Sequence, residues 1–392
     1  MRKILMLGAV ALMTATGGVV AQEVTFGGQV RPRFEFRSLD GFDADVGTHF
    51  TSMRTRVWLR AGLPSSVTAF VQLQDVRVWG EEASTTDGAA NAIDLHQGWL
   101  EFGDPVEGDH ALRLGRQELA YGEERLVGAL DWFQQARSFD GLRFRARPHD
   151  RPVVVDGFAM RIAEDDVFGR DSGFYGVYGT AGAYDVYALF NTFAESVDGA
   201  DDGTGQVTLG GRAAGDAGVA DWRVELAYQL GSRLGQDVAA YLLALRAGMP
   251  FGDGARAELW YDRLSGDDDP LDDEARVFDT LFATNHKFYG LMDLFTNIPL
   301  HTGGRGLQDL AVKTMVPVRE RGAAMADLHG FWVTAGDGLA STHLGIELDL
   351  TGRWSYAPGV GLSGGLGLFK GGDAWATNDL QTWLFAMVDV TF

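Results

Sequence analysis

Arginine is the side chain of this 392-residue sequence whose abundance and spacing suggest specific chemistry. Lysine occurs only at Lys3, Lys287, Lys313 and Lys370, so arginine supplies nearly all of the 33 basic residues. Arg54 and Arg56 are two positions apart, a spacing that places both side chains on one face of a β-strand. Because a guanidinium donates two parallel hydrogen bonds to a carboxylate, an arginine-rich face predicts contacts with anions.

Catalytic and metal-binding patterns are weak in this sequence. Residues 361–365 match the letters Gly-x-Ser-x-Gly, but that motif needs a strand-to-helix turn and a later histidine, and the last histidine is His343. The sequence has no cysteine, no His-Glu-x-x-His motif and no His-x-Ser pair. Adjacent carboxylates such as Glu123 and Glu124 lack a second placed partner for acid–base work on a glycoside. We therefore expect no enzyme, no cofactor and no bound metal.

Negative charge dominates the composition, with a formal net charge of −21. This balance argues against a nucleic-acid partner, because nucleic acids bind to basic surfaces. Much of the acid falls in long polar stretches, most densely at 267–274. We interpret these stretches as solvated loops. A Ca²⁺ site is the alternative, although the spacing lacks the pattern of an EF-hand loop.

The N-terminus has the pattern of an export signal. Arg2 and Lys3 precede an apolar segment at 4–13, and small residues end at Ala21. The apolar segment is too short for a membrane helix, which needs about 20 residues. We expect a signal peptide at 1–21 and a mature chain at 22–392 that is periplasmic, secreted or in an outer membrane.

Alternation with a period of two dominates the mature chain. One face of the first such segment is apolar, and the other face is charged. The apolar set is Val24, Phe26, Val30, Phe34 and Phe36, and the charged set is Arg31, Arg33, Glu35 and Arg37. Segments near 53–61, 221–230 and 343–353 repeat the pattern. Since successive strand residues point to opposite faces, the mature chain is predicted to be all-β.

Three features favour a membrane barrel over a secreted sandwich or another β-rich binding protein. The alternating segments reach ten or more residues, which matches a tilted membrane-spanning strand. Arginines on the polar face suit a wet lumen better than a dry core. The last strand ends at Phe392 on the apolar face, as in bacterial outer-membrane proteins, where it signals to the barrel-assembly machinery. We expect lipid and lipopolysaccharide around this barrel.

Short and long connections alternate along the chain. The short turns lie near 62–66, 103–110, 148–152, 179–183, 215–220, 250–255, 319–323 and 356–359. The longer stretches lie near 38–50, 80–92, 117–137, 163–172, 191–205, 231–237, 264–305, 334–341 and 369–381. These connections predict a single antiparallel transmembrane β-barrel of about 18 strands, with short periplasmic turns and long extracellular loops. A barrel of this size has room for an aqueous channel unless a loop folds inward.

Two segments resemble the alginate-export family of outer-membrane barrels. The first is LGRQELAYGEERLVG at 114–128, which continues to 131–132 and 137–141, and the second is ATNHKFYGLMDLF at 283–295. A looser match, LGIELD at 344–349, also occurs in other porins. The resemblance implies an 18-stranded barrel with an arginine-rich constriction for an anionic polysaccharide, with loops that help to gate it. Family members mostly act as single barrels, so a monomer is expected.

The resemblance also implies candidate site residues. The proposed constriction comprises Arg116, Arg125, Arg137 and Arg143, joined on alternation alone by Arg54 and Arg56, with Glu124 and Asp140 as acidic partners. Arg116 shares its face with Leu112 and Leu114, so only a bulge or a strand end would turn it inward. The alternative for every arginine is a bracing role against a wall carboxylate.

His286 and Lys287 fall in the long stretch at 264–305, which we interpret as a possible gating loop. The alternative is simple packing of the neighbouring Phe288, Tyr289, Met292 and Phe295. The resulting hypothesis is a passive channel that exports an acidic, alginate-like polysaccharide. The alternatives are a porin for small anions such as sugar acids, or a plugged barrel with a structural or adhesive role.

Overall fold

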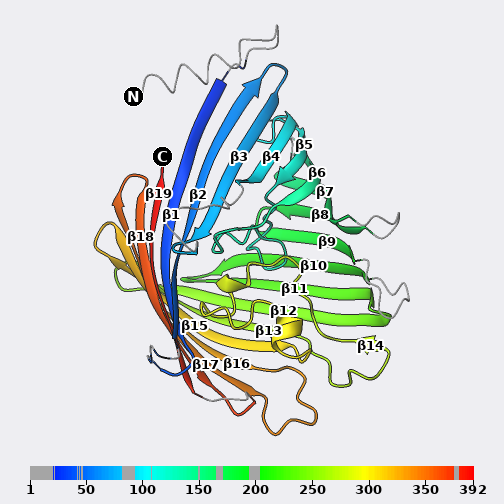
Figure 1. Cartoon of the computed structure of the whole chain (residues 1–392). Helices are drawn as coiled ribbons and strands as arrows, with labels where there is room; N and C mark the ends of the chain where they lie inside the picture. Colours follow the sequence, from blue (N-terminus) through cyan, green and yellow to red (C-terminus); the bar gives the residue numbers. More distant parts are fainter. Residues whose placement is uncertain are drawn as a thin grey trace.

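The computed structural model describes residues 21, 23–41, 43, 45, 47–81, 93–106, 108–148, 151–164, 171–193, 204–374 and 379–392 (Figure 1). The expected signal peptide lies outside the described residues except for Ala21, and so do parts of several long polar stretches. Among the described residues, no helix combines the length and the apolar character needed to span a membrane.

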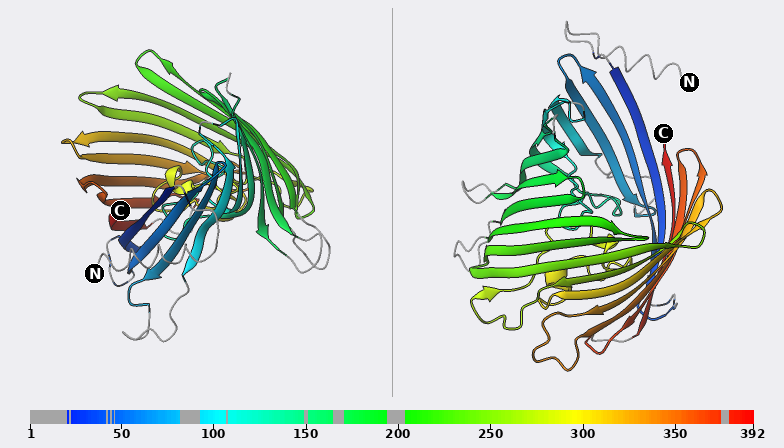
Figure 2. Two further views of the ribbon diagram at one scale, coloured as in Figure 1. Left: turned by 90° about the horizontal axis from the view of Figure 1, so that it is seen from above. Right: turned by 180° about the vertical axis from the view of Figure 1, so that it is seen from behind.

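One sheet of 19 strands makes the whole fold, and all of its strands except the two-residue β14 are long and antiparallel to their neighbours. β1 pairs with both β2 and β19, which closes the sheet into a barrel of 18 strands (Figure 2). The strands are β1 (Glu23–Ser38), β2 (Gly47–Leu63), β3 (Val67–Val78), β4 (Asp94–Gly103), β5 (His110–Gln117), β6 (Phe139–Ala146), β7 (Val153–Ala163), β8 (Ser172–Ala181), β9 (Tyr184–Phe193), β10 (Thr204–Ala217), β11 (Ala220–Arg233), β12 (Gln236–Phe251), β13 (Ala255–Leu264), β14 (Glu274–Ala275), β15 (Leu307–Val318), β16 (Gly322–Trp332), β17 (His343–Ala357), β18 (Val360–Gly371) and β19 (Leu380–Thr391). The predicted strand number is confirmed, and the sandwich alternative is excluded.

The two faces of each strand differ as the alternation predicts. In β1, Phe26 and Phe34 are 70% and 42% exposed on the outer surface, whereas Arg31 and Arg33 are 3% and 5% exposed inside. Large apolar side chains are exposed on the outside of the other long strands as well. The apolar face therefore contacts lipid, and the charged face lines the interior.

One connection is shorter than expected. The polar residues at 231–237 mostly continue β11 and β12, which are 14 and 16 residues long, and only Leu234 and Gly235 form the turn. Both turn residues have positive φ, at 51° and 80°. Two successive left-handed residues match the right-handed twist of a hairpin, so two residues suffice to reverse the chain.

Two loops fold into the barrel, and we name them loop A (118–138) and loop B (265–306). Loop B includes β14, the short 3₁₀ helix η1 (Asn285–Lys287) and the short helix α2 (Ile298–His301), and it lies among the strands (Figures 1 and 2). Val127 of loop A and Phe282 of loop B form a parallel bridge. Phe288, Tyr289 and Phe295 are each 1% exposed within the apolar core that the loops share with the wall. The barrel therefore has a packed core inside its lumen.

The outward orientation of Val312 yields a stability prediction. Val312 lies midway along β15 and is 46% exposed on the apolar face. We expect Val312→Arg to lower the free energy of unfolding in lipid vesicles by about 2–4 kcal/mol, because the charge enters the hydrocarbon. The matched control is Val219→Arg, at the exposed turn between β10 and β11, with an expected cost of about 0–1 kcal/mol. Equal unfolding curves in a urea titration of the two variants would contradict this membrane placement.

Candidate functional site

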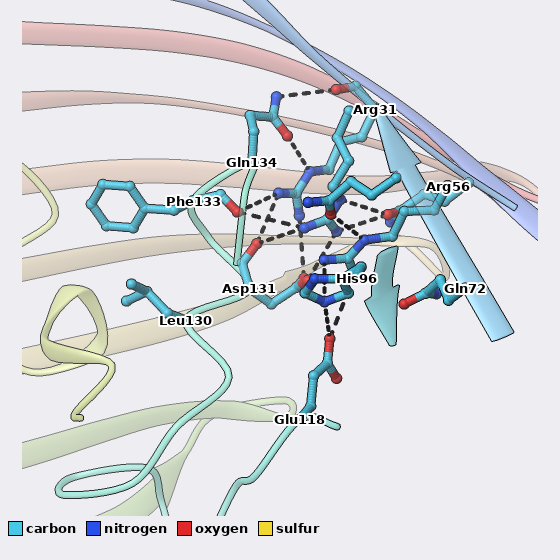
Figure 3. Close-up of polar contacts among 12 residues, drawn as sticks. Arg31, Arg56, Gln72, His96, Glu118, Leu130, Asp131, Phe133 and Gln134 are labelled. Atoms are coloured by element: carbon cyan, nitrogen blue, oxygen red, sulfur yellow. Dashed lines mark hydrogen bonds and ion pairs between the residues drawn. The ribbon is translucent and has the colours of Figure 1, made fainter. Parts of the chain in front are cut away.

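The lumenal arginines of β1 and β2 hold loop A. Arg31 donates from Nη2 to the carbonyl oxygen of Asp131 at 2.8 Å, and Arg33 donates from Nη1 to the carbonyl oxygen of Trp132 at 2.6 Å. Arg54 lies 2.9 Å from the Asp131 carboxylate and is 1% exposed. Figure 3 shows Arg31 and Arg56 directed toward this segment. These three arginines thus bind the protein's own loop through carbonyl oxygens and the Asp131 carboxylate.

Arg56 belongs to a second part of the same cluster. Its Nε donates to Oε1 of Gln74 at 2.7 Å, and its Nη2 lies 2.9 Å from Nε2 of His96. Nε2 of His96 also lies 2.7 Å from Oε1 of Glu118, at the start of loop A (Figure 3). The structure therefore places Arg54 and Arg56 in the lumen, with the loop as their partner. A contact between them and a cargo stays a prediction.

Arg125 joins loop A to the opposite wall and to loop B. Its guanidinium forms an ion pair with Asp262 of β13, lies 3.4 Å from Glu225 of β11, and stacks over Phe288 at 4.1 Å from the ring centre. Burial alone lowers the pKa of Arg125, but Asp262 and the other nearby acidic groups raise it overall. Arg125 is 5% exposed, so its role in the structure is bracing.

Arg137 connects the two loops through backbone carbonyl oxygens. It donates to the carbonyl oxygens of Gly128 and Ala283 at 3.1 and 3.3 Å, and also to that of Phe282. Burial lowers its pKa to about 10. Arg137 therefore stays charged at neutral pH, and it holds loop A against loop B.

Glu124, His286 and Lys287 all lie at the contact between the loops. Oε1 of Glu124 accepts from Lys287 at 2.9 Å, and its Oε2 accepts from the hydroxyl of Thr284 at 2.6 Å. His286 stacks on Trp132 with ring centres 4.2 Å apart and bonds through Nδ1 to Asp293 at 2.8 Å. His286 and Lys287, the residues of the expected gating loop, are thus inside the barrel. Their neighbours, such as Phe288 and Tyr289, pack in the core, as the alternative expected.

Carboxylates of β17 hold loop B by its backbone. The amide of Met292 donates to Oε1 of Glu347 at 2.9 Å, and the amide of Leu291 donates to Oδ2 of Asp349 at 3.1 Å. Gly290, with φ of 83°, allows the chain to approach Glu347 closely. The alternation identified both carboxylates as inward-facing, but nothing in it revealed loop B as their partner.

Arg116 and Asp140 lie on the outer surface. They are cross-strand neighbours in β5 and β6, and Nη1 of Arg116 lies 2.6 Å from Oδ2 of Asp140. Leu114 and Leu142 share their face and are 39% and 42% exposed to the outside. Although Gly115 has a positive φ of 121°, the register of β5 with β6 continues unbroken to Gln117, and the expected inward turn of Arg116 is absent. Its pairing with Asp140 braces the outer face and not the pore.

Arg143 belongs to a ladder of lumenal arginines on β5 and β6. Arg113 faces Arg143 across the strands, and Nη2 of Arg113 lies 2.8 Å from Oε2 of Glu101, whereas Arg143 lies 3.7 Å from the same atom. Arg145 bonds to both oxygens of Asp156 at 2.7 Å. Three guanidiniums thus share two carboxylates. Arg113 and Arg145 were missed as candidates, although the same alternation includes them.

The acidic stretch at 267–274 is organised by an arginine. Arg276 lies 2.8 Å from Asp272 and 2.7 Å from Glu274. In the described part of the chain, no group of three or more His, Asp or Glu side chains has a geometry suited to a metal ion.

A closed barrel with an apolar exterior and a charged, loop-bearing lumen defines an outer-membrane β-barrel channel. The sequence profile of the alginate export family matches residues 22–389, and the chain belongs to this family. Among solved structures, the chain is similar to Acinetobacter baumannii OccAB4 (TM-score 0.65, 11% identity, covering 95% of this chain and 99% of the other). It is also similar to Pseudomonas aeruginosa OccK3 (OpdO) (TM-score 0.63, 13% identity, covering 95% and 96%). At these identities the likeness shows the fold alone. No curated protein matches the sequence.

Gly290 provides a test of how loop B is held. An added methyl group would meet the Glu347 carboxylate and would also strain the left-handed backbone, so we expect Gly290→Ala to cost about 1–3 kcal/mol and to loosen loop B. The control is Gly303→Ala in the same loop, which has φ of 60° but open space around the added methyl group. Limited proteolysis of the folded barrel measures loop release. Equal cleavage rates in the two variants would show that contact with Glu347 does not position the loop.

Proposed function

We propose that this channel passively conducts anionic cargo, and that the cargo is an acidic, alginate-like polysaccharide. The observation that carries the proposal is the arginine ladder of Arg113, Arg143 and Arg145. It faces the lumen and contains one guanidinium more than its carboxylate partners, Glu101 and Asp156. The side chains of Arg113 and Arg145 are 17% and 26% exposed. The family membership supports the same cargo.

The chemistry of uronates fits such a ladder. A carboxylate on each sugar can accept paired hydrogen bonds from a guanidinium, and cations along a pore favour anions over cations. Several weak sites in series let a polymer slide, whereas one tight site would hold it. The pore has no intrinsic direction, so export follows from the gradient of the polymer.

A second candidate function is conduction of small anions such as sugar acids. The observation that favours it is the packed contact between loops A and B, in which Phe288 and Tyr289 are 1% exposed, because such a core narrows the lumen. In the polymer hypothesis, the segment with His286 and Lys287 moves as a gate. A plugged barrel with a structural or adhesive role remains the third candidate, and it predicts no conductance.

In this proposal, the two ends of the chain direct its export and its insertion into the outer membrane. Residues 1–21 direct export and are removed, and Phe392 presents the signal for the barrel-assembly machinery. Phe392 is 70% exposed, and its backbone pairs with Gly28 of β1. Lipid and lipopolysaccharide surround a monomeric barrel.

Arg143 is the residue that tests anion preference. Glu101 keeps Arg113 as its partner when Arg143 is replaced, so Arg143→Gln removes the surplus cation without leaving a buried carboxylate unpaired. We expect the wild-type channel to prefer anions in a salt gradient across a planar bilayer, and Arg143→Gln to reduce the anion-to-cation permeability ratio by roughly two- to fivefold.

The matched control is Arg116→Gln, which removes the same charge from the outer surface and is expected to leave the ratio unchanged. Cation preference in the wild type would overturn the proposed function. An unchanged ratio in Arg143→Gln would assign the ladder to bracing, and the absence of any conductance would favour the plugged barrel.

A further inference from the structure

Three aromatic side chains form a continuous strip on the lumenal wall. Trp58 of β2, Phe70 of β3 and Trp99 of β4 lie on neighbouring strands, and they alternate with outward residues such as Val57 and Val71, which are 49% and 44% exposed. The ring centres of Trp58 and Phe70 are 6.1 Å apart at 29°, and those of Phe70 and Trp99 are 5.0 Å apart at 21°. We name these residues the aromatic strip.

The aromatic strip lies toward the short-turn end of the barrel, away from the core of loops A and B. Phe70 is the fourth residue of β3, which begins directly after the turn from β2. All three rings are half-buried. Apolar surface facing a water-filled lumen is unfavourable unless something covers it, so three such rings in a row indicate a ligand surface.

Cations flank the aromatic strip on both sides. The guanidinium of Arg113 lies over Trp99 at 3.8 Å from the ring centre. Exposed Arg60, on the lumenal face of β2, lies directly opposite Phe70 across the strands. The strip is therefore continuous with the arginine ladder, and groups that bind carboxylates lie beside its apolar rings.

Amide side chains and a hollow complete the surroundings. Trp99 donates from Nε1 to Gln97 at 3.3 Å, and Gln97 donates to Gln72 at 3.2 Å. A hollow of about 390 Å³ adjoins Trp58 and is lined by Gly28, Gln29, Arg56, Trp58, Gln72, Thr391 and Phe392. This volume falls in the range of small-molecule sites, which combine aromatic walls with a few polar groups.

We propose that the aromatic strip is a carbohydrate-binding track for uronate residues, an inference that rests on the proposed function and gives it a subsite. Because the rings stack on one another and Arg113 covers Trp99, the apolar face of a sugar ring packs along the lumenal edges of the rings. The hydroxyl groups bond to Gln72 and Gln97, and the carboxylate pairs with Arg60 or Arg113. A charged ladder alone would attract any anion. Rings beside cations select anions that also have an apolar face.

The experiment compares sugar binding by purified full-length protein in detergent micelles, using titration calorimetry with two probes. The probes are a short oligouronate and a neutral oligosaccharide of the same length. The test variant is Trp58→Leu with Phe70→Leu, which retains Arg60 and Arg113. The control is Trp222→Leu with Phe144→Leu, which removes one tryptophan and one phenylalanine from the lipid-facing surface, where they are 38% and 44% exposed. Heat-modifiable migration in gels verifies that each barrel is folded.

We expect the wild type to bind both sugars, and the oligouronate more tightly because of its carboxylates. The test variant weakens both affinities by about tenfold, which corresponds to the loss of contact with two aromatic side chains, and the control leaves both unchanged. Replacement by Trp58→Phe with Phe70→Tyr restores binding. If the wild type binds neither sugar, or if the test variant binds both as tightly as the wild type, the proposal is overturned.

The salt-gradient measurement separates this inference from the proposed function. Anion preference that persists in the test variant shows that the ladder acts independently of the strip. If the wild type prefers cations but the test variant still loses its affinity for both sugars, the proposed anion channel fails and the carbohydrate track stands.

Discussion

The need to satisfy every backbone amide and carbonyl within hydrocarbon constrains the whole molecule. An open sheet would leave the edges of β1 and β19 without partners in lipid, and their antiparallel pairing removes both edges. Once the sheet closes, each strand has one face in lipid and one face inside. A sequence with a period of two therefore places its apolar side chains in lipid and its charged side chains in the lumen. Phe26 and Phe34 then face outward, and Arg31 and Arg33 have only the lumen available. The charged interior is thus a consequence of closure.

Charges confined to the lumen need partners, and two inward loops provide them. Arginine offers only donors, so the β1–β2 wall binds loop A through carbonyl oxygens, as Arg33 does with Trp132. Carboxylates offer only acceptors, so β17 binds loop B through amides, as Glu347 does with Met292. In these contacts, loop A presents carbonyl oxygens to arginines, and loop B presents amides to carboxylates. A buried charged group that loses its hydrogen-bond partner costs about 1–3 kcal/mol or more, which keeps both loops inside.

The alternation of residue types and the lengths of the turns predicted the 18 strands, their orientation and the inward position of Arg54 and Arg56. The family resemblance, and not the alternation, named Arg143. The alternation did not predict the partners, because contacts such as that between Arg125 and Asp262 join segments 137 residues apart. Arg116 shows that the family resemblance also failed to predict the surroundings of a residue. The resemblance placed it in a constriction, but its position in β5 fixes its face, and the strand has no bulge to reverse it. The two-residue turn at Leu234 and Gly235 was predicted as a longer loop, because polar residues can extend a strand beyond the membrane.

Bracing and transport make opposite demands on the same side chain. A guanidinium that holds a loop must be buried and fully paired, as Arg54 is at 1% exposure, and a buried group cannot reach a passing polymer. A guanidinium that guides cargo must keep a donor exposed to water and must release its ligand quickly. Arg143 is closer to the second demand than Arg54, because its side chain is 12% exposed and Arg113 lies nearer to the carboxylate they share. Stacking on Trp99 orients Arg113 without occupying all of its donors. The neighbours of each arginine therefore determine whether it braces a loop or is available to an anion. In the proposed function, the available guanidinium groups lie on the wall from β2 to β6.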